Sequence, residues 1–243
     1  MEISTGPSST TDENSMTKMA LEESEKQVQI VDFATAKHKN ETEINVTEIA
    51  SQPDNEVVFS KTHTPNHLII SPYTDPAHQL DLTTVDFQSQ LLAEALTMLA
   101  PATSSYATAP YALALNWSVV FTYLKTLANK RNRKWIKAEF YVVEFRSKLK
   151  PEIDRPLLFA LDKESHREAT ASGGLLKYWF GAPDAERRNL ATCVWSSKED
   201  AVAGRKGPWH RRARGVTMQM YKEIDVKGLK LTIEDDIAGW TFE

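Results

Sequence analysis

The pattern of apolar and polar positions is clearest in the last hundred residues, where strand-like and helix-like periods alternate as β-α-β-β-α-β. The strand-like runs are "EFYVVEFRSKL" (139–149), "LLKYWF" (175–180), "NLATCVW" (189–195) and "VKGLKLTI" (226–233). Apolar positions in these runs recur about every second residue, and helical periods separate the first run from the second and the third from the fourth. This order predicts a four-stranded antiparallel sheet with two helices on one face.

Alternation along the strands divides the predicted sheet into two faces. One face is expected to be cleanly apolar and covered by the two helices, with Tyr141, Val143 and Phe145 on the first strand and Leu229 and Leu231 on the last. The second face is mixed, because aliphatic and charged side chains share it. Its charged members are Glu144, Arg146, Lys177 and Lys230. Such a face is expected to be covered, either by the same sheet of a second copy or by helices of the chain itself.

Two amphipathic runs upstream supply those helices. The run at 86–100 can be capped by Thr84 or Asp86, and the run at 112–128 places Trp117 and Phe121 on one apolar side. Shorter strand-like runs lie at Val57–Ser60 and His67–Ser71. We therefore predict an N-terminal helical cover region over 56–135 and a ferredoxin-like α+β domain over 136–243.

The first helix of the predicted domain begins after Asp154, which can cap it, and ends at Gly173-Gly174. The second helical stretch begins after Ser196-Ser197 and starts again at Pro208. The apolar side expected for its second part is formed by Trp209, Ala213, Val216 and Met220.

Charge separates the N-terminal tail from the rest of the 243 residues. Residues 1–56 hold 12 acidic and 4 basic residues, whereas the remainder carries a net charge of +4. Residues 1–55 are rich in Ser, Thr, Glu and Lys and poor in aromatic residues, so they are expected to form a disordered acidic tail. No apolar run reaches the ~20 residues of a membrane span, and no secretory signal is recognisable, which predicts a cytoplasmic protein with no membrane partner.

Two histidines are candidates for acid–base chemistry. His166 follows Asp162 by one helical turn, so the carboxylate could orient the imidazole for proton transfer, or the two could form an ordinary surface pair. His210 lies beside the predicted apolar side of its helix and could act as a general base or a haem ligand. It could equally be a boundary histidine bonded to the backbone. No spacing of His and Cys supports a metal site.

The aromatic residues Tyr178, Trp195 and Trp209 could line a ligand cavity or belong to the core. Arg146 could recognise a polar ligand or pair with Glu144. The single cysteine, Cys193, excludes an intrachain disulfide and is expected to be buried and inert. An RNA-binding role is not expected, because Leu190, Thr192 and Val194 replace the aromatic stacking positions of the third strand.

Strings such as "SGGLLKYWFG" and "RNLATCVW" resemble an uncharacterised protein family known mainly from fungi, over most of the chain from about residue 85. A looser similarity, carried by "VWSSKEDA" and "PWHRRA", links the chain to ferredoxin-like dimeric α+β barrels of the antibiotic-biosynthesis monooxygenase kind. The matching positions are Trp195, Ser197, Glu199 and His210. This similarity implies binding of a small organic molecule and a homodimer. The "GRKGP" interruption and the long N-terminal half depart from it.

Two functions follow as hypotheses. The first is a small-molecule-binding, barrel-like protein that acts as a cofactor-independent isomerase, cyclase or oxygenase in secondary metabolism. Its catalytic residues would be His210, His166 and Asp162, and its ligand-binding residues Trp195, Tyr178, Trp209 and Arg146. The second is a non-catalytic binding or interaction protein on the same scaffold. Neither hypothesis involves nucleic acid. No cofactor is expected, and haem is the alternative.

Overall fold

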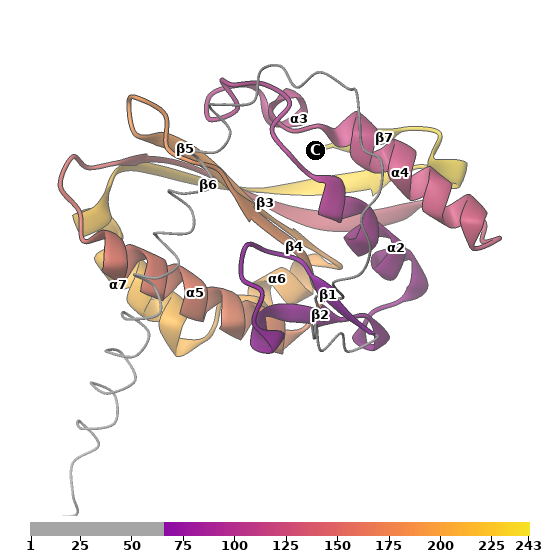
Figure 1. The fold of residues 1–243 in the computed structure, drawn as a ribbon, viewed down its shortest axis with the longest axis horizontal. Coiled ribbons are helices and arrows are strands. Elements are labelled where there is room, and N and C mark those ends of the chain that lie inside the picture. The colour runs from indigo at the N-terminus through magenta and orange to yellow at the C-terminus, as the bar shows by residue number, and fades with distance from the viewer. Residues whose placement is uncertain (1–65) are drawn as a thin grey trace, which may run out of the picture. The chain divides into compact units, whose positions relative to one another are not determined.

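Five antiparallel strands form the sheet at the centre of the structure, a computed structural model that describes residues 66–243 (Figure 1). The strands lie in the order β4-β5-β3-β6-β7. They span Ala138–Leu149 (β3), Leu175–Phe180 (β4), Arg188–Trp195 (β5), Tyr221–Ile233 (β6) and Trp240–Phe242 (β7). With helix α5 between β3 and β4 and helices α6 and α7 between β5 and β6, the first four strands form the predicted ferredoxin-like βαββαβ unit. The predicted disordered tail over 1–55 lies outside the described residues, and so does the predicted strand-like run Val57–Ser60.

The helices of this unit begin and end where the sequence predicts. Asp154 caps α5 (Arg155–Ser172) by accepting a hydrogen bond from the Leu157 N–H, and Gly173 follows the helix with φ +88°. Ser197 caps α6 (Lys198–Gly204) in the same way. Helix α7 spans Pro208–Met220, and only Met220 of its predicted apolar side is fully buried. All three helices lie on one side of the sheet (Figure 1).

The second face of the sheet is covered by the chain's own N-terminal helices, which decides between the two predicted covers. Helices α2 (Phe87–Ala95), α3 (Tyr111–Ala114) and α4 (Trp117–Lys130) lie on the side opposite α5 (Figure 1). Asp86 caps α2 by accepting hydrogen bonds from two backbone N–H groups. Trp117 and Phe121 of α4 stack with ring centroids 5.8 Å apart, and Phe121 meets Trp240 of β7 at 4.5 Å. Each such aromatic pair contributes about 0.5–1.5 kcal/mol beyond its burial.

The distribution of apolar residues between the two faces differs from the prediction. Strand pairing places Phe140 opposite Leu231 and Val142 opposite Leu229, so Leu229 and Leu231 share the face covered by α2 and α4. Lys230 pairs with Tyr141 and lies on the other face. The prediction of one cleanly apolar face was therefore wrong. Alternation shows which residues of one strand lie on the same face. Only the pairing register between neighbouring strands shows which residues of the next strand share that face.

A separate hairpin pairs β1 (His67–Ile69), which lies within the predicted strand-like run His67–Ser71, with β2 (Gln79–Asp81). Strand β2 was not predicted, nor was β7, which extends the sheet beyond β6. The backbone N–H of Tyr178 donates to the carbonyl of Ile70, which attaches the segment after β1 to the edge of β4. In β2 and β7, three residues carry too little periodic signal to be recognised from the sequence.

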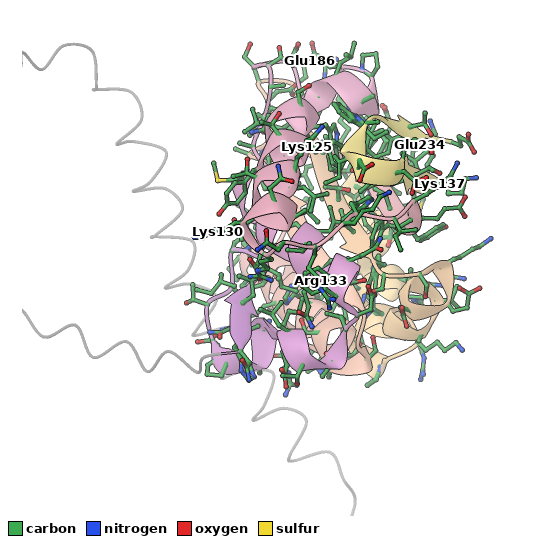
Figure 2. All side chains as sticks on the ribbon, turned by 90° about the vertical axis from the view of Figure 1, so that its right-hand side faces the viewer. Lys125, Lys130, Arg133, Lys137, Glu186 and Glu234 are labelled. Carbon is green, nitrogen blue, oxygen red and sulfur yellow. The ribbon has the colours of Figure 1, made fainter. Side chains whose placement is uncertain are left out.

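The basic run at the end of α4 forms ordinary surface contacts. Arg131 donates to both carboxylate oxygens of Glu94, and the Arg133 guanidinium lies 4.5 Å from the Phe87 ring centroid. Figure 2 shows Lys125 and Lys130 along α4 and Lys137 beside Glu234, with which Lys137 forms an ion pair of 3.0 Å. The basic run Lys130, Arg131, Arg133 and Lys134 is therefore a solvated helix end.

Candidate functional site

A polar cluster lies between α5, β4 and the segment that follows β1. Its centre is Asp162, whose carboxylate accepts hydrogen bonds from the hydroxyls of Tyr73 and Tyr178, both at 2.5 Å. The two tyrosines come from β4 and from a segment about ninety residues upstream of Asp162, so only the tertiary fold brings them together. We name this group, with His78 and His166, the Asp162 cluster.

Burial controls the ionisation of the Asp162 carboxyl. Loss of solvent raises its pKa, and the two tyrosine hydroxyls oppose this shift without cancelling it. The pKa values of Tyr73 and Tyr178 are also raised, first by burial and then by the neighbouring Asp162. The phenols therefore stay protonated and act as hydrogen-bond donors, while the carboxyl holds its proton more tightly than an exposed one.

His166 meets a second histidine rather than Asp162. The Nδ1 atoms of His166 and His78 are 2.9 Å apart, so one ring donates to the other. The Thr170 hydroxyl lies 3.4 Å from the same Nδ1 of His166. Nε2 of His166 is buried and has no hydrogen-bond partner among residues 66–243. Burial, with smaller contributions from His78 and His210, lowers the His166 pKa to about 3, so the imidazole is neutral at physiological pH.

His210 belongs to a different arrangement. Glu168 of α5 accepts hydrogen bonds from the backbone N–H groups of Trp209 and His210, and His210 Nδ1 lies 3.1 Å from the same carboxylate. Burial acts to raise the Glu168 pKa, but these hydrogen bonds outweigh it and the pKa is lowered. Glu168 thus caps the N-terminus of α7 from another helix. No hydrogen bond joins His210 to Asp162 or His166 within 66–243, and haem ligation by His210 stays a prediction.

The predicted aromatic ligand residues have separate surroundings. Trp195 is only 4% exposed, and its ring lies directly against Gly204 of α6. Trp209 is half-buried, with the Arg212 guanidinium 4.8 Å from its ring centroid. Of the predicted site residues, Tyr178, Asp162 and His166 come together in the Asp162 cluster. Trp195 and Trp209 do not join it.

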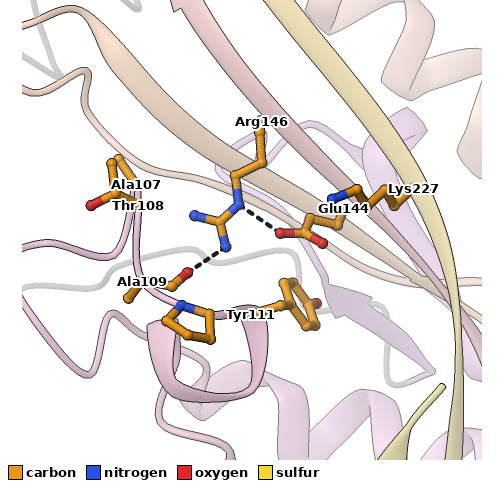
Figure 3. A pocket seen from close by; sticks show the side chains of 8 residues that line it. Ala107, Thr108, Ala109, Tyr111, Glu144, Arg146 and Lys227 are labelled. Carbon is orange, nitrogen blue, oxygen red and sulfur yellow. Dashed lines mark hydrogen bonds and ion pairs between the residues drawn. The ribbon is translucent and has the colours of Figure 1, made fainter.

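A pocket of about 380 Å³ lies on the other face of the sheet, between β3, β6 and the loop before α3 (Figure 3). We name it the Glu144 pocket. Arg146 donates from Nε to Glu144 at 2.6 Å and also reaches the carbonyl oxygens of Tyr106 and Ala109. The predicted pairing between Arg146 and Glu144 is therefore present. The lining residues are Ala107, Thr108, Ala109, Pro110, Tyr111, Glu144, Arg146 and Lys227.

The floor of the Glu144 pocket keeps one oxygen atom available. Glu144 is only 7% exposed, and its second carboxylate oxygen, Oε2, accepts no hydrogen bond from any residue in the described part of the chain. Tyr111 is fully engaged, because Thr192 donates its hydroxyl to the Val143 carbonyl and so accepts from the Tyr111 hydroxyl at 2.7 Å. The unused hydrogen-bonding capacity at the base of the pocket is thus an acceptor.

A second pocket of about 500 Å³ lies between the β1–β2 hairpin and the C-terminal end of α5. We name it the Thr170 pocket. Ala77 and Thr170 line it, and each adjoins the Asp162 cluster, since Ala77 precedes His78 and the Thr170 hydroxyl reaches His166. Arg167 and Asp81 supply the charged groups of its lining. Neither pocket is lined by His210 or Trp195.

Sequence reasoning missed Tyr73, His78 and Glu168. The first two lie in a segment whose Pro and polar residues indicate only a loop, and Glu168 resembles any exposed helical glutamate. No local signal could have identified their partners, which are all distant in sequence. Among residues 66–243 there is no group of three or more His, Cys, Asp or Glu side chains arranged to hold a metal ion. In the same range, no helix is long and apolar enough to cross a bilayer.

Comparison with known proteins identifies relatives of the chain. A family model described as PB2B2.08-like matches residues 69–243. The UPF0643 protein PB2B2.08 of Schizosaccharomyces pombe is 36% identical over 192 residues, which cover 76% of this chain and 87% of that protein. The resemblance to an uncharacterised family predicted from the sequence is confirmed.

Solved structures give a weaker likeness. Rv0793 from Mycobacterium tuberculosis matches 37% of this chain and 92% of its own, with 18% identity and a TM-score of 0.33. A candidate antibiotic biosynthesis monooxygenase from Nitrosomonas europaea matches 40% and 91%, with 15% identity and a TM-score of 0.33. A similar protein from Chloroflexus aurantiacus is 22% identical over 37% of this chain and 89% of its own, with a TM-score of 0.31. At these TM-scores the likeness carries no argument about activity.

Proposed function

This chain belongs to the PB2B2.08-like family, and we propose that its ferredoxin-like scaffold binds a small polar organic molecule in the Glu144 pocket. One observation carries the proposal: a nearly buried carboxylate presents an unused oxygen to a pocket of about 380 Å³. Small-molecule sites typically combine such a concave space of several hundred Å³ with a few fixed polar groups. A ligand that donates to this oxygen inside the pocket would form a charge-assisted hydrogen bond, which is stronger than one between neutral groups.

The lining defines the chemical class of the ligand. Glu144 Oε2 requires a donor, such as an ammonium or hydroxyl group. Lys227, whose ammonium lies 3.2 Å from Asp225 and is largely exposed, can attract a negative group at the rim. The Arg146 guanidinium bonds to Glu144 and to two backbone carbonyls of the loop that forms the pocket wall. It therefore anchors this loop and is not available to bind a ligand through two parallel N–H groups. A small zwitterion or hydroxy acid fits this arrangement.

Ligand-observed NMR with a panel of free amino acids and small hydroxy acids tests the proposal. We expect at least one compound to bind the wild type, and Glu144→Gln to weaken its binding by at least about tenfold, since each lost charge-assisted hydrogen bond contributes about 1.5–3 kcal/mol. Glu139→Gln is the matched control, because Glu139 is an exposed glutamate on the same strand. Binding that is equal in Glu144→Gln and the wild type, or no binding within the panel, would overturn the proposal.

A second candidate function is proton transfer at the Asp162 cluster, as in a cofactor-independent isomerase or cyclase. The observation that favours it is a buried carboxyl of raised pKa held between two phenol donors. In such a step, His166 Nε2 would accept the proton from the substrate carbon, and the Asp162 carboxyl in its protonated form, with a tyrosine hydroxyl, would stabilise the enolate oxygen until the proton returns. The Thr170 pocket, whose Thr170 hydroxyl reaches His166, gives a substrate a place to bind next to the cluster.

Deuterium exchange into a panel of ketones in D₂O, followed by NMR, tests this second function. We expect exchange above the buffer rate with the wild type and its loss in Asp162→Asn and Tyr178→Phe, with Glu139→Gln unchanged. If Asp162→Asn exchanges as fast as the wild type, or the wild type does not exceed buffer, proton transfer at this cluster is rejected. Neither result bears on the Glu144 pocket, which lies on the opposite face of the sheet.

A further inference from the structure

Strand β6 has an open outer edge along half its length. Its inner edge pairs with β3 from Tyr221 to Ile233, whereas β7 pairs with it only at Leu231–Ile233, and the hydrogen bonds to Glu243 end at Lys230. Residues 223–229 therefore have no strand beside them within the described range. Ile224 and Val226 in this stretch are 43% and 52% exposed. A long exposed edge with apolar side chains is a ready template for another strand.

The direction of the free backbone groups follows from the bonds at Lys230. Both the N–H and the C=O of Lys230 bond to Glu243, so they point away from β3. Successive residues of a strand direct these groups to opposite sides, and the β3–β6 register is regular up to Glu223. Ile224, Val226 and Gly228 therefore also direct their N–H and C=O groups outward, toward the open edge.

We propose that a second copy of this chain pairs with this edge, β6 against β6 and antiparallel, about a two-fold axis at Val226. In this register Val226 faces the partner's Val226, and Ile224 faces the partner's Gly228. All three outward-directed residues are then bonded, giving about six inter-strand hydrogen bonds. The contact is isologous, because the same surface serves both subunits.

Charge complementarity selects the second copy and this register. Asp225 and Lys227 project from the same face of β6, since they pair with Arg146 and Glu144 on β3. About the axis at Val226, Asp225 faces the partner's Lys227 and Lys227 faces the partner's Asp225. Each opposite pair of this kind contributes about 0.2–1 kcal/mol. An axis at Asp225 would instead place Asp225 against the partner's Asp225, which is unfavourable.

The pairing would also bring the partner close to the Glu144 pocket, because Lys227 lines that pocket. The partner's Asp225 would then stand at the rim. The inference goes beyond the proposed ligand binding and does not depend on it, since the inter-strand hydrogen bonds join only backbone groups of β6. Lys227 is shared by the interface and the ligand site.

Molar mass in solution, measured by light scattering on the full chain between about 1 and 200 µM, is the first test. We expect a species of twice the 27.4 kDa chain mass at the upper concentrations. Val226→Pro should weaken dimerisation at least about tenfold. It removes one outward N–H and leaves the β3 ladder intact, as proline is tolerated at a sheet edge. Val226→Thr keeps the N–H and should remain dimeric. A monomeric wild type, or a Val226→Pro variant that dimerises normally, overturns the proposal.

Charge reversal is a second, independent test that does not alter the backbone. Asp225→Lys places like charges opposite each other and should favour the monomer, whereas Asp225→Lys combined with Lys227→Asp should restore the dimer. A dimer that is unaffected by Asp225→Lys, or one that the double variant fails to restore, contradicts the register at Val226. Circular dichroism of each variant distinguishes loss of pairing from loss of fold.

Discussion

Tyr73 donates its hydroxyl to the carboxylate of Asp162 across 89 residues of sequence, at 2.5 Å. The bond attaches the segment after β1 to helix α5. Tyr178 donates its hydroxyl to the other oxygen of the same carboxyl group. The stability of the Asp162 cluster therefore depends on residues at three separate places in the chain.

Tyr73→Phe is expected to destabilise the protein by about 1–3 kcal/mol, because it leaves a buried carboxylate oxygen without its donor. Urea denaturation followed by tryptophan fluorescence measures the change. Tyr123→Phe is the control, since Tyr123 is exposed on α4 and its change should stay within about 0.5 kcal/mol. Equal stability of Tyr73→Phe and the wild type would mean that the hydroxyl contributes nothing.

The raised pKa of Asp162 makes its contribution to stability fall as pH rises. The folded state holds the proton more tightly than the unfolded state, so stability is lost as pH rises above the ordinary aspartate value of about 4. Asp162→Asn lacks this titration. The free energy of unfolding of the wild type minus that of Asp162→Asn should therefore decrease between pH 4 and pH 7. A difference that is constant across this range would contradict the raised pKa.

His166 acts in the opposite direction. Its pKa in the folded state is lowered to about 3, so the unfolded state binds a proton first as pH falls below about 6.5. Stability is then lost by up to about 1.4 kcal/mol per pH unit down to pH 3. Subtracting the profile of His166→Gln from that of the wild type isolates this slope. We expect a positive slope between pH 3 and pH 6.5, and a flat difference would exclude the buried neutral imidazole.

Arg146→Met should destabilise the protein by about 3–5 kcal/mol, because it leaves Glu144 as an unpaired buried charge and frees two loop carbonyls. Amide exchange at residues 103–110 should increase with it. Arg188→Met removes surface pairs to Asp184 and Glu186 and should cost no more than about 1 kcal/mol. Loop exchange that stays at the wild-type rate in Arg146→Met would show that Arg146 does not anchor the loop.

Gly204→Ala and Gly215→Ala should have opposite effects, although both add a methyl group to a helix. A Cβ at Gly204 would collide with the buried ring of Trp195, and we expect a loss of about 1–3 kcal/mol. A Cβ at Gly215 meets nothing within 4 Å, so the better helix propensity of Ala should stabilise by about 0.5–1 kcal/mol. Thermal unfolding measures both, and two changes of the same sign would contradict the packing of α6 on Trp195.

Local signals explain which parts of the fold could be predicted. The strands of the βαββαβ unit and the caps Asp86, Asp154 and Ser197 are encoded within a few residues of themselves, by alternation and by side chains that bond nearby N–H groups. The helical runs that cover the second face were also recognisable, although the run predicted as one helix over 112–128 is divided into α3 and α4. The sequence could not show that these helices, and not a second subunit, cover the face, because either cover would bury the same side chains.

The residues of the candidate sites could be predicted in part from the sequence, but their partners could not. Asp162, His166 and Tyr178 could be named from residue type and spacing, and Arg146 with Glu144 from their shared strand face. Their actual partners could not, since Tyr73 and His78 reach the cluster from a segment without a regular period.

The sequence by itself determined the family, the order of strands and helices, and most of the helix ends, because these depend on contacts between residues close in the chain. The tertiary structure alone decided which apolar rows share a face, that α2, α3 and α4 cover the second one, and that Asp162 bonds to two tyrosines rather than to His166. These outcomes depend on register and on long-range packing, where one residue's partner is set by the position of whole elements and not by its neighbours in sequence.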